Sequence, residues 1–252
     1  MKGARVDSRE RMLVFDFDGT VSLGHGPVRS YARHVSSGLG AGDAAEFLTI
    51  FEDRLTKPPS TAADATHPID GYDLVRLLAE RHQVSAAARS AAYLASRHDL
   101  GTADAPILAP AGLADFLAEA RPTAHLVLAT NAPAIRIDEA LAALGLAGAF
   151  DSVHTSVGKP AGFGPVLDGL LARLPAGSPA AALLSVGDVW ENDLEPAYRR
   201  GAETALVGDR MPAAATPTYR ATHLHELYPA LRAWLDTGSV SATTAEPGST
   251  PA

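Results

Sequence analysis

The chain has 252 residues, of which 46% are hydrophobic and 20% charged, with a formal net charge of −8 and no cysteine. This length suits one large domain or a core with a smaller insert, and the lack of cysteine excludes disulfides and thiolate chemistry. The acidic balance disfavours nucleic acid as a partner, because a phosphate backbone would be repelled over most of the surface.

Both ends of the chain are expected to be disordered. Residues 1–10 are polar and aperiodic, and residues 236–252 are polar and low in complexity. The N-terminal residues lack the apolar stretch of an export signal, and no run approaches the roughly 20 apolar residues of a membrane span. We therefore expect a cytoplasmic protein with no membrane partner.

Four short apolar runs predict buried β-strands. The first begins at Met12 and is ended by Gly19, and the others cover residues 125–130, 181–186 and 204–207. Strands that alternate with helices predict an α/β fold with a doubly wound parallel sheet, whose ligands bind beyond the carboxyl ends of the strands. The apolar spacing of helices is found between the runs, in residues 113–120, 137–144 and 166–171.

Residues 22–106 interrupt this alternation of strands and helices. They contain no convincing strand, but amphipathic or alanine-rich helical stretches lie at 44–55, 74–81 and 85–97, with a breaker, Lys57-Pro-Pro-Ser-Thr, after the first. The chain is therefore expected to consist of a Rossmann-like core and a helical insert, which comprise residues 11–21 with 107–235 and residues 22–106, respectively.

The strongest chemical signal is Asp16-Phe-Asp-Gly-Thr, directly after the first strand. Alternation along a strand puts Asp16 and Asp18 on the same side, although the turn at Gly19 bends the second one away. Two such carboxylates would repel each other in a low-dielectric setting, and a divalent cation removes this penalty. Carboxylate ligands suit Mg²⁺, which also binds substrate phosphate.

Three further segments supply groups that bind phosphate or metal. Thr130-Asn131 offers a hydroxyl and helix-start N–H groups for phosphate oxygens, and Lys159 offers a point cation. The third strand ends at Asp188, and Asp193 follows five residues later, so that this segment supplies a further metal ligand and its support. Together these groups give an acidic protein the local positive charge that a phosphate site needs.

In this order, the motifs Asp-Phe-Asp-Gly-Thr, Thr-Asn, Lys-Pro and Gly-Asp-x-x-x-x-Asp closely resemble the four motifs of the haloacid dehalogenase superfamily. The resemblance covers residues 11–21 and 107–210. It implies a magnesium-dependent phosphatase that acts on a small phosphorylated metabolite. It also implies that residues 22–106 form a helical cap, an element that closes over the site and selects the substrate.

The resemblance assigns catalytic roles by position. Asp16 would be the nucleophile that forms an aspartyl phosphate, and Asp18 would protonate the leaving oxygen and then activate water. Thr130, Asn131 and Lys159 would bind the phosphate.

A metal site follows from the same resemblance. Asp16, the backbone carbonyl of Asp18 and Asp188 would hold Mg²⁺, and Asp193 would support Lys159 or a metal-bound water. Chemistry would then need core residues alone.

The cations of the insert would bind the part of the substrate remote from phosphorus and so choose among substrates. No motif in the insert identifies that substrate. His25 and Arg29 are the first candidates because they lie nearest to Asp18 in the sequence. The remaining candidates are Arg33, Arg54, Lys57 and Arg76.

Three other functions remain open. A phosphomutase of the superfamily uses the same aspartyl phosphate but passes the group back to a sugar. A haloacid dehalogenase needs no magnesium and generally lacks the second aspartate, whereas Asp18 is present. A non-catalytic module that binds a phosphorylated ligand would usually have lost the nucleophile or the acid, and both Asp16 and Asp18 are present.

Overall fold

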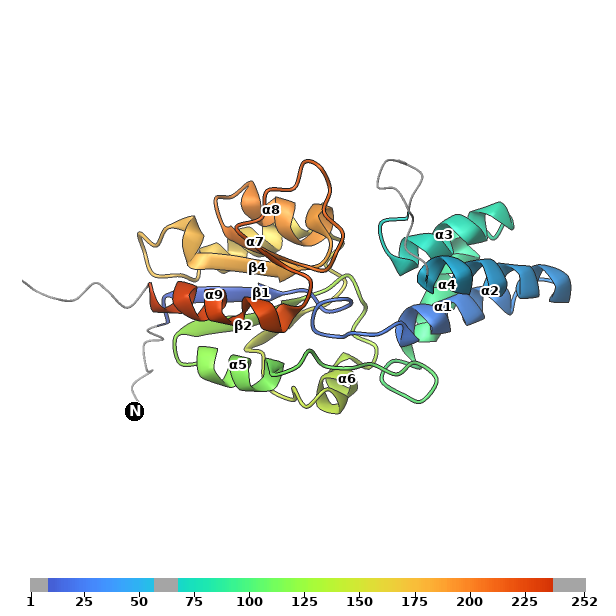
Figure 1. Cartoon of the computed structure of the whole chain (residues 1–252), viewed down its shortest axis with the longest axis horizontal. Helices are drawn as coiled ribbons and strands as arrows, with labels where there is room; N and C mark the ends of the chain where they lie inside the picture. The colour runs from blue at the N-terminus through green and yellow to red at the C-terminus, as the bar shows by residue number, and fades with distance from the viewer. Residues whose placement is uncertain (1–8, 57–67, 238–252) are drawn as a thin grey trace, which may run out of the picture.

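The computed structural model describes residues 9–56 and 68–237, which form a sheet flanked by helices and, beside it, a group of four helices (Figure 1). The predicted breaker at Lys57 and the terminal segments 1–8 and 238–252 lie outside the described residues. Within the described ranges, every helix is too short or too polar to cross a bilayer.

A six-stranded parallel sheet forms the centre of the larger part, in the order β3-β2-β1-β4-β5-β6. The first strand, β1, lies in the middle of the sheet. The strands β2 and β3 follow in order on one side of it, and β4, β5 and β6 follow in order on the other, which confirms the predicted doubly wound arrangement. The end of β1 therefore lies where the strand order reverses, the usual place for a ligand. The strands are β1 (Arg11–Phe15), β2 (Ala124–Ala129), β3 (Ser152–His154), β4 (Leu183–Gly187), β5 (Glu203–Val207) and β6 (Tyr219–Ala221).

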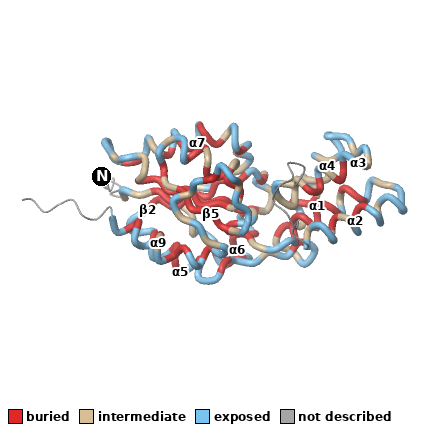
Figure 2. Tube along the Cα trace, turned by 45° about the horizontal axis from the view of Figure 1, so that its top comes forward, coloured by how far each residue is buried: buried red, intermediate tan, exposed pale blue. Residues whose placement is uncertain are grey.

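Alternate side chains of β1 enter two different cores, as expected for a strand that is buried on both faces. Leu13 and Phe15 pack with α5, α6 and α9, whereas Met12 and Val14 pack with α7 and α8. Figure 2 shows the buried strands between these two helical layers. The layers consist of α5 (Leu113–Ala120), α6 (Ile137–Ala143), α7 (Phe163–Leu171), α8 (Glu195–Tyr198) and α9 (Leu224–Asp236).

The helices of the insert pack around a core of their own. Phe47 and Phe51 of α2 are fully buried in it together with Leu78 of α3, while Leu48 lies at its edge. This core is separate from the two cores beside the sheet, so the insert has its own source of stability. The helices are α1 (Gly26–Ser36), α2 (Ala41–Thr56), α3 (Gly71–Arg81) and α4 (Ala86–Arg97).

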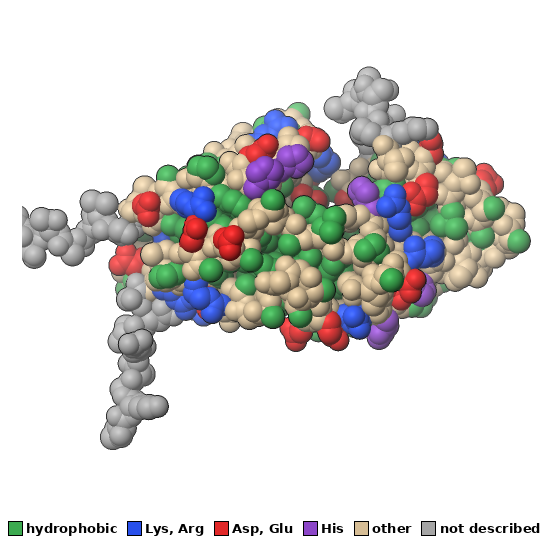
Figure 3. All heavy atoms as spheres, turned by 60° about the horizontal axis from the view of Figure 1, so that its bottom comes forward, with side chains coloured by type: hydrophobic (Ala, Val, Ile, Leu, Met, Phe, Trp, Pro, Cys, Tyr) green, Lys and Arg blue, Asp and Glu red, His purple; other side chains and the backbone are tan. Residues whose placement is uncertain are grey.

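Two adjacent connections join the insert to the sheet. The N–H of Leu23 donates to the carbonyl of Leu108 (2.8 Å), and the N–H of Leu108 donates to the carbonyl of Leu23 (3.0 Å). The molecular surface is indented between the two parts (Figure 3). Residues that follow β1, β2 and β4 line a cavity there, together with residues of the insert.

Phe51→Ala is expected to lower the free energy of unfolding by roughly 3–5 kcal/mol, because it leaves a cavity in a closely packed core. Leu48→Ala removes a side chain from the edge of the same core and should lose clearly less. Denaturant unfolding followed by circular dichroism measures both variants. Equal losses would contradict the assignment of Phe51 to the centre of the insert core.

Candidate active site

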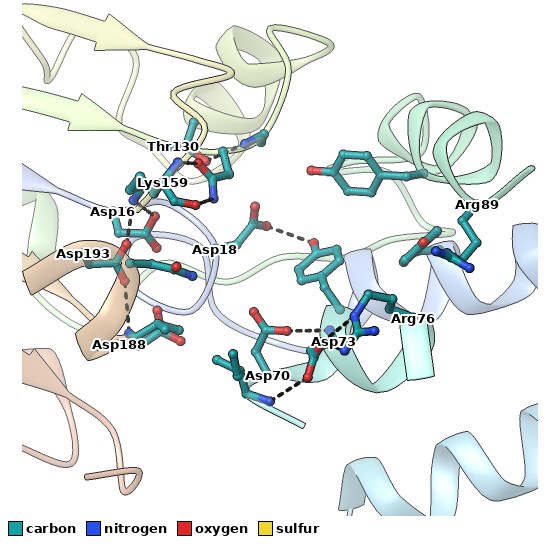
Figure 4. A pocket seen from close by; sticks show the side chains of 18 residues that line it. Asp16, Asp18, Asp70, Asp73, Arg76, Arg89, Thr130, Lys159, Asp188 and Asp193 are labelled. Atoms are coloured by element: carbon teal, nitrogen blue, oxygen red, sulfur yellow. Dashed lines mark hydrogen bonds and ion pairs between the residues drawn. The ribbon is translucent and has the colours of Figure 1, made fainter. Parts of the chain in front are cut away.

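Side chains from several strand ends and from the insert line one cavity of about 610 Å³. Parallel strands bring their carboxyl ends to one edge of the sheet, and these residues follow β1, β2, β3 and β4. Figure 4 shows the core residues on one side of the cavity and the insert residues, including Arg76 and Arg89, on the other. All the site residues predicted in the core line this cavity, namely Asp16, Asp18, Thr130, Asn131, Lys159, Asp188 and Asp193.

Lys159 joins two aspartates at the base of the cavity. Its Nζ lies 2.6 Å from Oδ1 of Asp16 and 2.7 Å from Oδ1 of Asp193, and 7% of the residue is exposed. Hydrogen bonds between charged groups at this distance are about twice as strong as neutral ones. They fix the carboxylate of Asp16, whose backbone N–H is held by the carbonyl of Val186 (2.9 Å).

The loop that carries Lys159 is positioned by Asn131. The Asn131 side chain accepts the backbone N–H of Lys159 (2.6 Å), and its Nδ2 donates to the carbonyl of Lys159 (3.1 Å). The amide therefore holds the lysine in place, a positional role that was not predicted for it from the sequence. Next to it, Oγ1 of Thr130 accepts the N–H of Ala132 (3.0 Å) and keeps its own proton as a donor.

Asp193 is fixed by the π-helical turn η2 (Trp190–Leu194). Its Oδ2 accepts the N–H of Val189 (3.0 Å), and its carbonyl accepts the hydroxyl of Ser185 (2.7 Å). Both carboxylate oxygens of Asp193 are thus engaged, one by a backbone N–H and one by Lys159. This geometry gives Asp193 a supporting position behind the lysine.

Asp188 approaches the loop after β1 so closely that residue 19 has to be glycine. Gly19 has a φ of +91°, a region that L side chains rarely adopt. A Cβ at this position would also lie 2.3 Å from Oδ2 of Asp188. The glycine in the Asp-Phe-Asp-Gly-Thr motif therefore makes room for the carboxylate that follows β4.

Three carboxylates lie close together beside one lysine, which pairs with Asp16 and Asp193. Oxygen atoms of Asp16, Asp188 and Asp193 lie within 4.8 Å of one another. Burial and the nearby Asp193 raise the pKa of Asp16 to about 7, although Lys159 opposes this shift. Burial, followed by the charges of Asp16 and Asp193, also raises the pKa of Asp188 well above its ordinary value.

The lysine itself remains charged in this setting. Burial alone would lower the pKa of Lys159, but the charges of Asp16 and Asp193 outweigh that effect and raise it. When all three carboxylates are ionised, two negative charges are left without compensation. Oxygen donors with this excess of charge fit a divalent cation such as Mg²⁺.

The insert contacts Asp18 through two residues that the sequence analysis did not select. The hydroxyl of Tyr72 donates to Oδ1 of Asp18 (3.2 Å), and Nη1 of Arg97 lies 3.4 Å from each of its carboxylate oxygens. Arg29, a first candidate from the sequence, instead pairs with Glu52 through two hydrogen bonds (2.8 and 2.9 Å). It is not among the described residues that line the cavity.

The other predicted cations of the insert are distributed differently. Arg76 lines the cavity, whereas His25 lines an adjoining cavity of about 400 Å³ and Lys57 lies outside the described residues. Nearness in sequence to Asp18 therefore places His25 beside an adjoining cavity that Asp18 also lines, whereas Arg29 pairs with Glu52. One feature of the sequence did point to Arg97. Tyr93, which also lines the cavity, lies four residues before Arg97 on α4, and this spacing puts both side chains on one face of the helix.

No protein-family model and no curated protein matches the sequence, whereas solved structures match most of it. YfnB from Bacillus subtilis, assigned as a haloacid dehalogenase (HAD) hydrolase and bound to magnesium, is 20% identical. The match covers 89% of this chain and 99% of that one, with a TM-score of 0.56. A HAD phosphatase from Thermococcus onnurineus is 18% identical over 88% of this chain and 97% of that one, with a TM-score of 0.51.

A dehalogenase solved with an intermediate complex is also 18% identical, over 89% of this chain and 98% of that one, with a TM-score of 0.52. The chain therefore has the fold of the haloacid dehalogenase superfamily of hydrolases, which confirms the fold that the four motifs implied. Structures of this fold include both a phosphatase and a dehalogenase, so the fold is common to two kinds of reaction.

Gly19→Ala is expected to displace Asp188 and to weaken magnesium binding by roughly 10–100-fold, the range seen when the support of a metal ligand is disturbed. Gly145→Ala is the matched control, because Gly145 also has a positive φ (+73°) but a Cβ there would meet no atom within 4 Å. Magnesium titration calorimetry measures both. Equal weakening in the two variants would show that strain, and not the contact with Asp188, is responsible.

The metal-free protein is expected to lose stability as pH rises from about 4 to about 7. Over this window the unfolded chain releases the proton of Asp16 while the folded chain, with its pKa raised from 3.8 to about 7, retains it. Mg²⁺ binds the ionised form, so it should raise the unfolding midpoint more at pH 8 than at pH 5.5. Thermal unfolding with and without Mg²⁺ checks this. Asp16→Asn should reduce the effect, although Asp188, whose pKa is also raised, still contributes, and exposed Asp168→Asn should keep it.

Proposed function

We propose that the protein is a magnesium-dependent phosphatase that hydrolyses a small phosphorylated metabolite through an aspartyl phosphate. One arrangement carries this proposal, namely the buried carboxylate of Asp16 held by Lys159, with the second carboxylate of Asp18 lining the same cavity. A nucleophile, a cation and a proton donor are the groups that phosphoryl transfer through a covalent intermediate requires.

Two steps follow from this arrangement. In the first, a carboxylate oxygen of Asp16 attacks phosphorus, the bond from phosphorus to the leaving oxygen breaks, and Asp18 gives that oxygen a proton. In the second, water attacks the phosphorus of the aspartyl phosphate and gives a proton to Asp18. The bond between phosphorus and Asp16 then breaks, and phosphate is released.

Lys159 and Thr130 are placed to bind the transferred group. The ammonium of Lys159 has three N–H donors, of which Asp16 and Asp193 engage two, so one remains for a phosphoryl oxygen. The hydroxyl proton of Thr130 is a second donor. Both donors would stabilise the charge that the phosphoryl group carries in the transition state.

Asp16, Asp188 and the backbone carbonyl of Asp18 would hold Mg²⁺, with Asp193 supporting Lys159. When bound, the ion supplies positive charge to the carboxylates and to the phosphoryl oxygens. The charge balance of the cluster supports this assignment, since three neighbouring carboxylates are accompanied by the single positive charge of Lys159.

Asp18 favours phosphatase chemistry over the cleavage of a carbon–halogen bond. The oxygen that leaves phosphorus needs a proton, whereas a halide leaves as a stable anion without one. An acid beside the nucleophile therefore serves the first reaction and not the second. The acidic cluster of Asp16, Asp188 and Asp193 points the same way, because it requires a cation.

The cavity would also accommodate the rest of the substrate. A volume of about 610 Å³ suits a metabolite. On the side of the insert it is lined by Tyr31, Tyr93, Arg76 and Arg89, which would contact the part of the substrate remote from phosphorus. The insert would thus act as a cap that excludes water and selects the substrate.

Phosphate release from 4-nitrophenyl phosphate in the presence of Mg²⁺ tests the proposal. Asp16→Asn should lower kcat by at least about 10³-fold, because the covalent step is lost, and chelation should abolish activity until Mg²⁺ is restored. The exposed variant Asp168→Asn should keep wild-type activity.

Other outcomes would identify other functions. Release of halide from a 2-haloacid in excess chelator would indicate a dehalogenase. Isomerisation of a sugar phosphate without release of phosphate would indicate a phosphomutase. Wild-type turnover by Asp16→Asn would remove the covalent mechanism.

A further inference from the structure

Arg97 is the last residue of α4 and one of the largest fully buried side chains, with 1% of its surface exposed. Its Nη1 lies 3.4 Å from both carboxylate oxygens of Asp18 and 3.2 Å from the hydroxyl of Tyr72. The same hydroxyl donates to Oδ1 of Asp18 (3.2 Å). Two residues of the insert and the second aspartate of the core thus form a closed triangle of contacts.

The burial of Arg97 is unfavourable by itself. Within residues 9–56 and 68–237, its Nε and Nη2 have no protein partner, and an unsatisfied buried donor costs about 1–3 kcal/mol. Among those same residues, Asp18 is the one carboxylate that forms an ion pair with it. An arginine that served packing alone would be replaced at lower cost by an apolar side chain.

The surroundings of Arg97 are built to hold its guanidinium over Asp18. The guanidinium lies 6.0 Å from the ring centre of Tyr93. Tyr93 in turn packs edge-on against Tyr72, at 5.9 Å between ring centres, and against Tyr31, at 5.5 Å. These rings fix the hydroxyl of Tyr72 and the guanidinium of Arg97 together, so both reach Asp18 from one rigid wall of the insert.

We propose that Arg97 and Tyr72 are positioning residues for Asp18, through which the insert takes part in the chemical step. The inference rests on the proposed phosphatase function. Asp18 follows β1 on a loop, and its single carboxylate would serve both proton transfers. The orientation of this carboxylate therefore affects the rate of each transfer. The insert sets that orientation through these contacts, so proton transfer depends on the insert lying against the core.

This role differs from the selection of substrates that the sequence implied for cations of the insert. A residue that binds the remote part of a substrate changes KM and the preference among substrates. A residue that positions the proton donor lowers kcat, and it does so most where the leaving group most needs a proton. Its effect must also disappear when Asp18 is absent, because it acts through that residue.

The test compares Arg97→Gln and Tyr72→Phe in the wild-type background and in Asp18→Asn. The substrates are 4-nitrophenyl phosphate and phenyl phosphate, which are similar in size, but phenol is the poorer leaving group. Arg97→Gln should lower kcat on phenyl phosphate by about 10–100-fold, part of the range for general acid–base catalysis. It should lower kcat less on 4-nitrophenyl phosphate, with KM changed by less than about twofold.

In the Asp18→Asn background, the same two substitutions should cause little further loss. Arg200→Gln is the matched control, since it removes a guanidinium that pairs with Asp168 outside the cavity, and it should leave kcat unchanged in both backgrounds. Arg97→Lys keeps the charge and should recover part of the loss. If Arg97→Gln does not fold, Tyr72→Phe is compared in the two backgrounds instead, because it keeps the ring and removes one hydroxyl.

The opposing outcomes are distinct. Losses of equal size with and without Asp18, or equal losses on both substrates, would assign Arg97 and Tyr72 a purely structural role. A rise in KM with unchanged kcat would make them substrate-binding residues. No phosphate release by the wild-type protein from either substrate would overturn the proposed function and this inference together, whereas an active wild type with additive losses would overturn only the inference.

Discussion

Three neighbouring carboxylates and the single ammonium group that pairs with two of them impose the constraint on which the rest of the site depends. Lys159 can satisfy Asp16 and Asp193 only if the loops after β1 and β3 and the turn η2 all meet at one edge of the sheet. The pairing of β1 with both β2 and β4 provides that meeting point. The charge that the lysine leaves uncompensated suits a divalent cation, and such an ion would supply the local positive charge that the proposed phosphate site needs in a protein of net charge −8.

The close approach of these segments explains several residues that have no chemistry of their own. Gly19 leaves room for Asp188, and a Cβ at Gly187 would lie 2.3 Å from Cβ of Asp193. Asn131 holds the backbone of Lys159 through both the oxygen and the nitrogen of its side-chain amide. Such residues determine where the charged groups lie, so catalytic geometry here is as much a matter of backbone packing as of charge.

The insert has a hydrophobic core of its own and also contacts the candidate site. Its own core around Phe47 and Phe51 allows the four helices to behave as one body, joined to the sheet by two adjacent connections at Leu23 and Leu108. Tyr72 and Arg97 of the insert nevertheless contact Asp18, which lines the same cavity as Asp16.

The sequence alone was enough to predict the parallel sheet and the residues at its carboxyl edge. Long apolar runs identify buried strands, and parallel pairing brings residues such as Asp16 and Asp188 together wherever they stand in the chain. The three-residue strands β3 and β6 were too short to show a pattern, whereas α1 and α9 were missed although their apolar residues have helical spacing. The pairing of Arg97 with Asp18, 79 residues apart, was decided by the tertiary structure alone, because the packing of one helical body against the sheet determines which of its side chains reach the site.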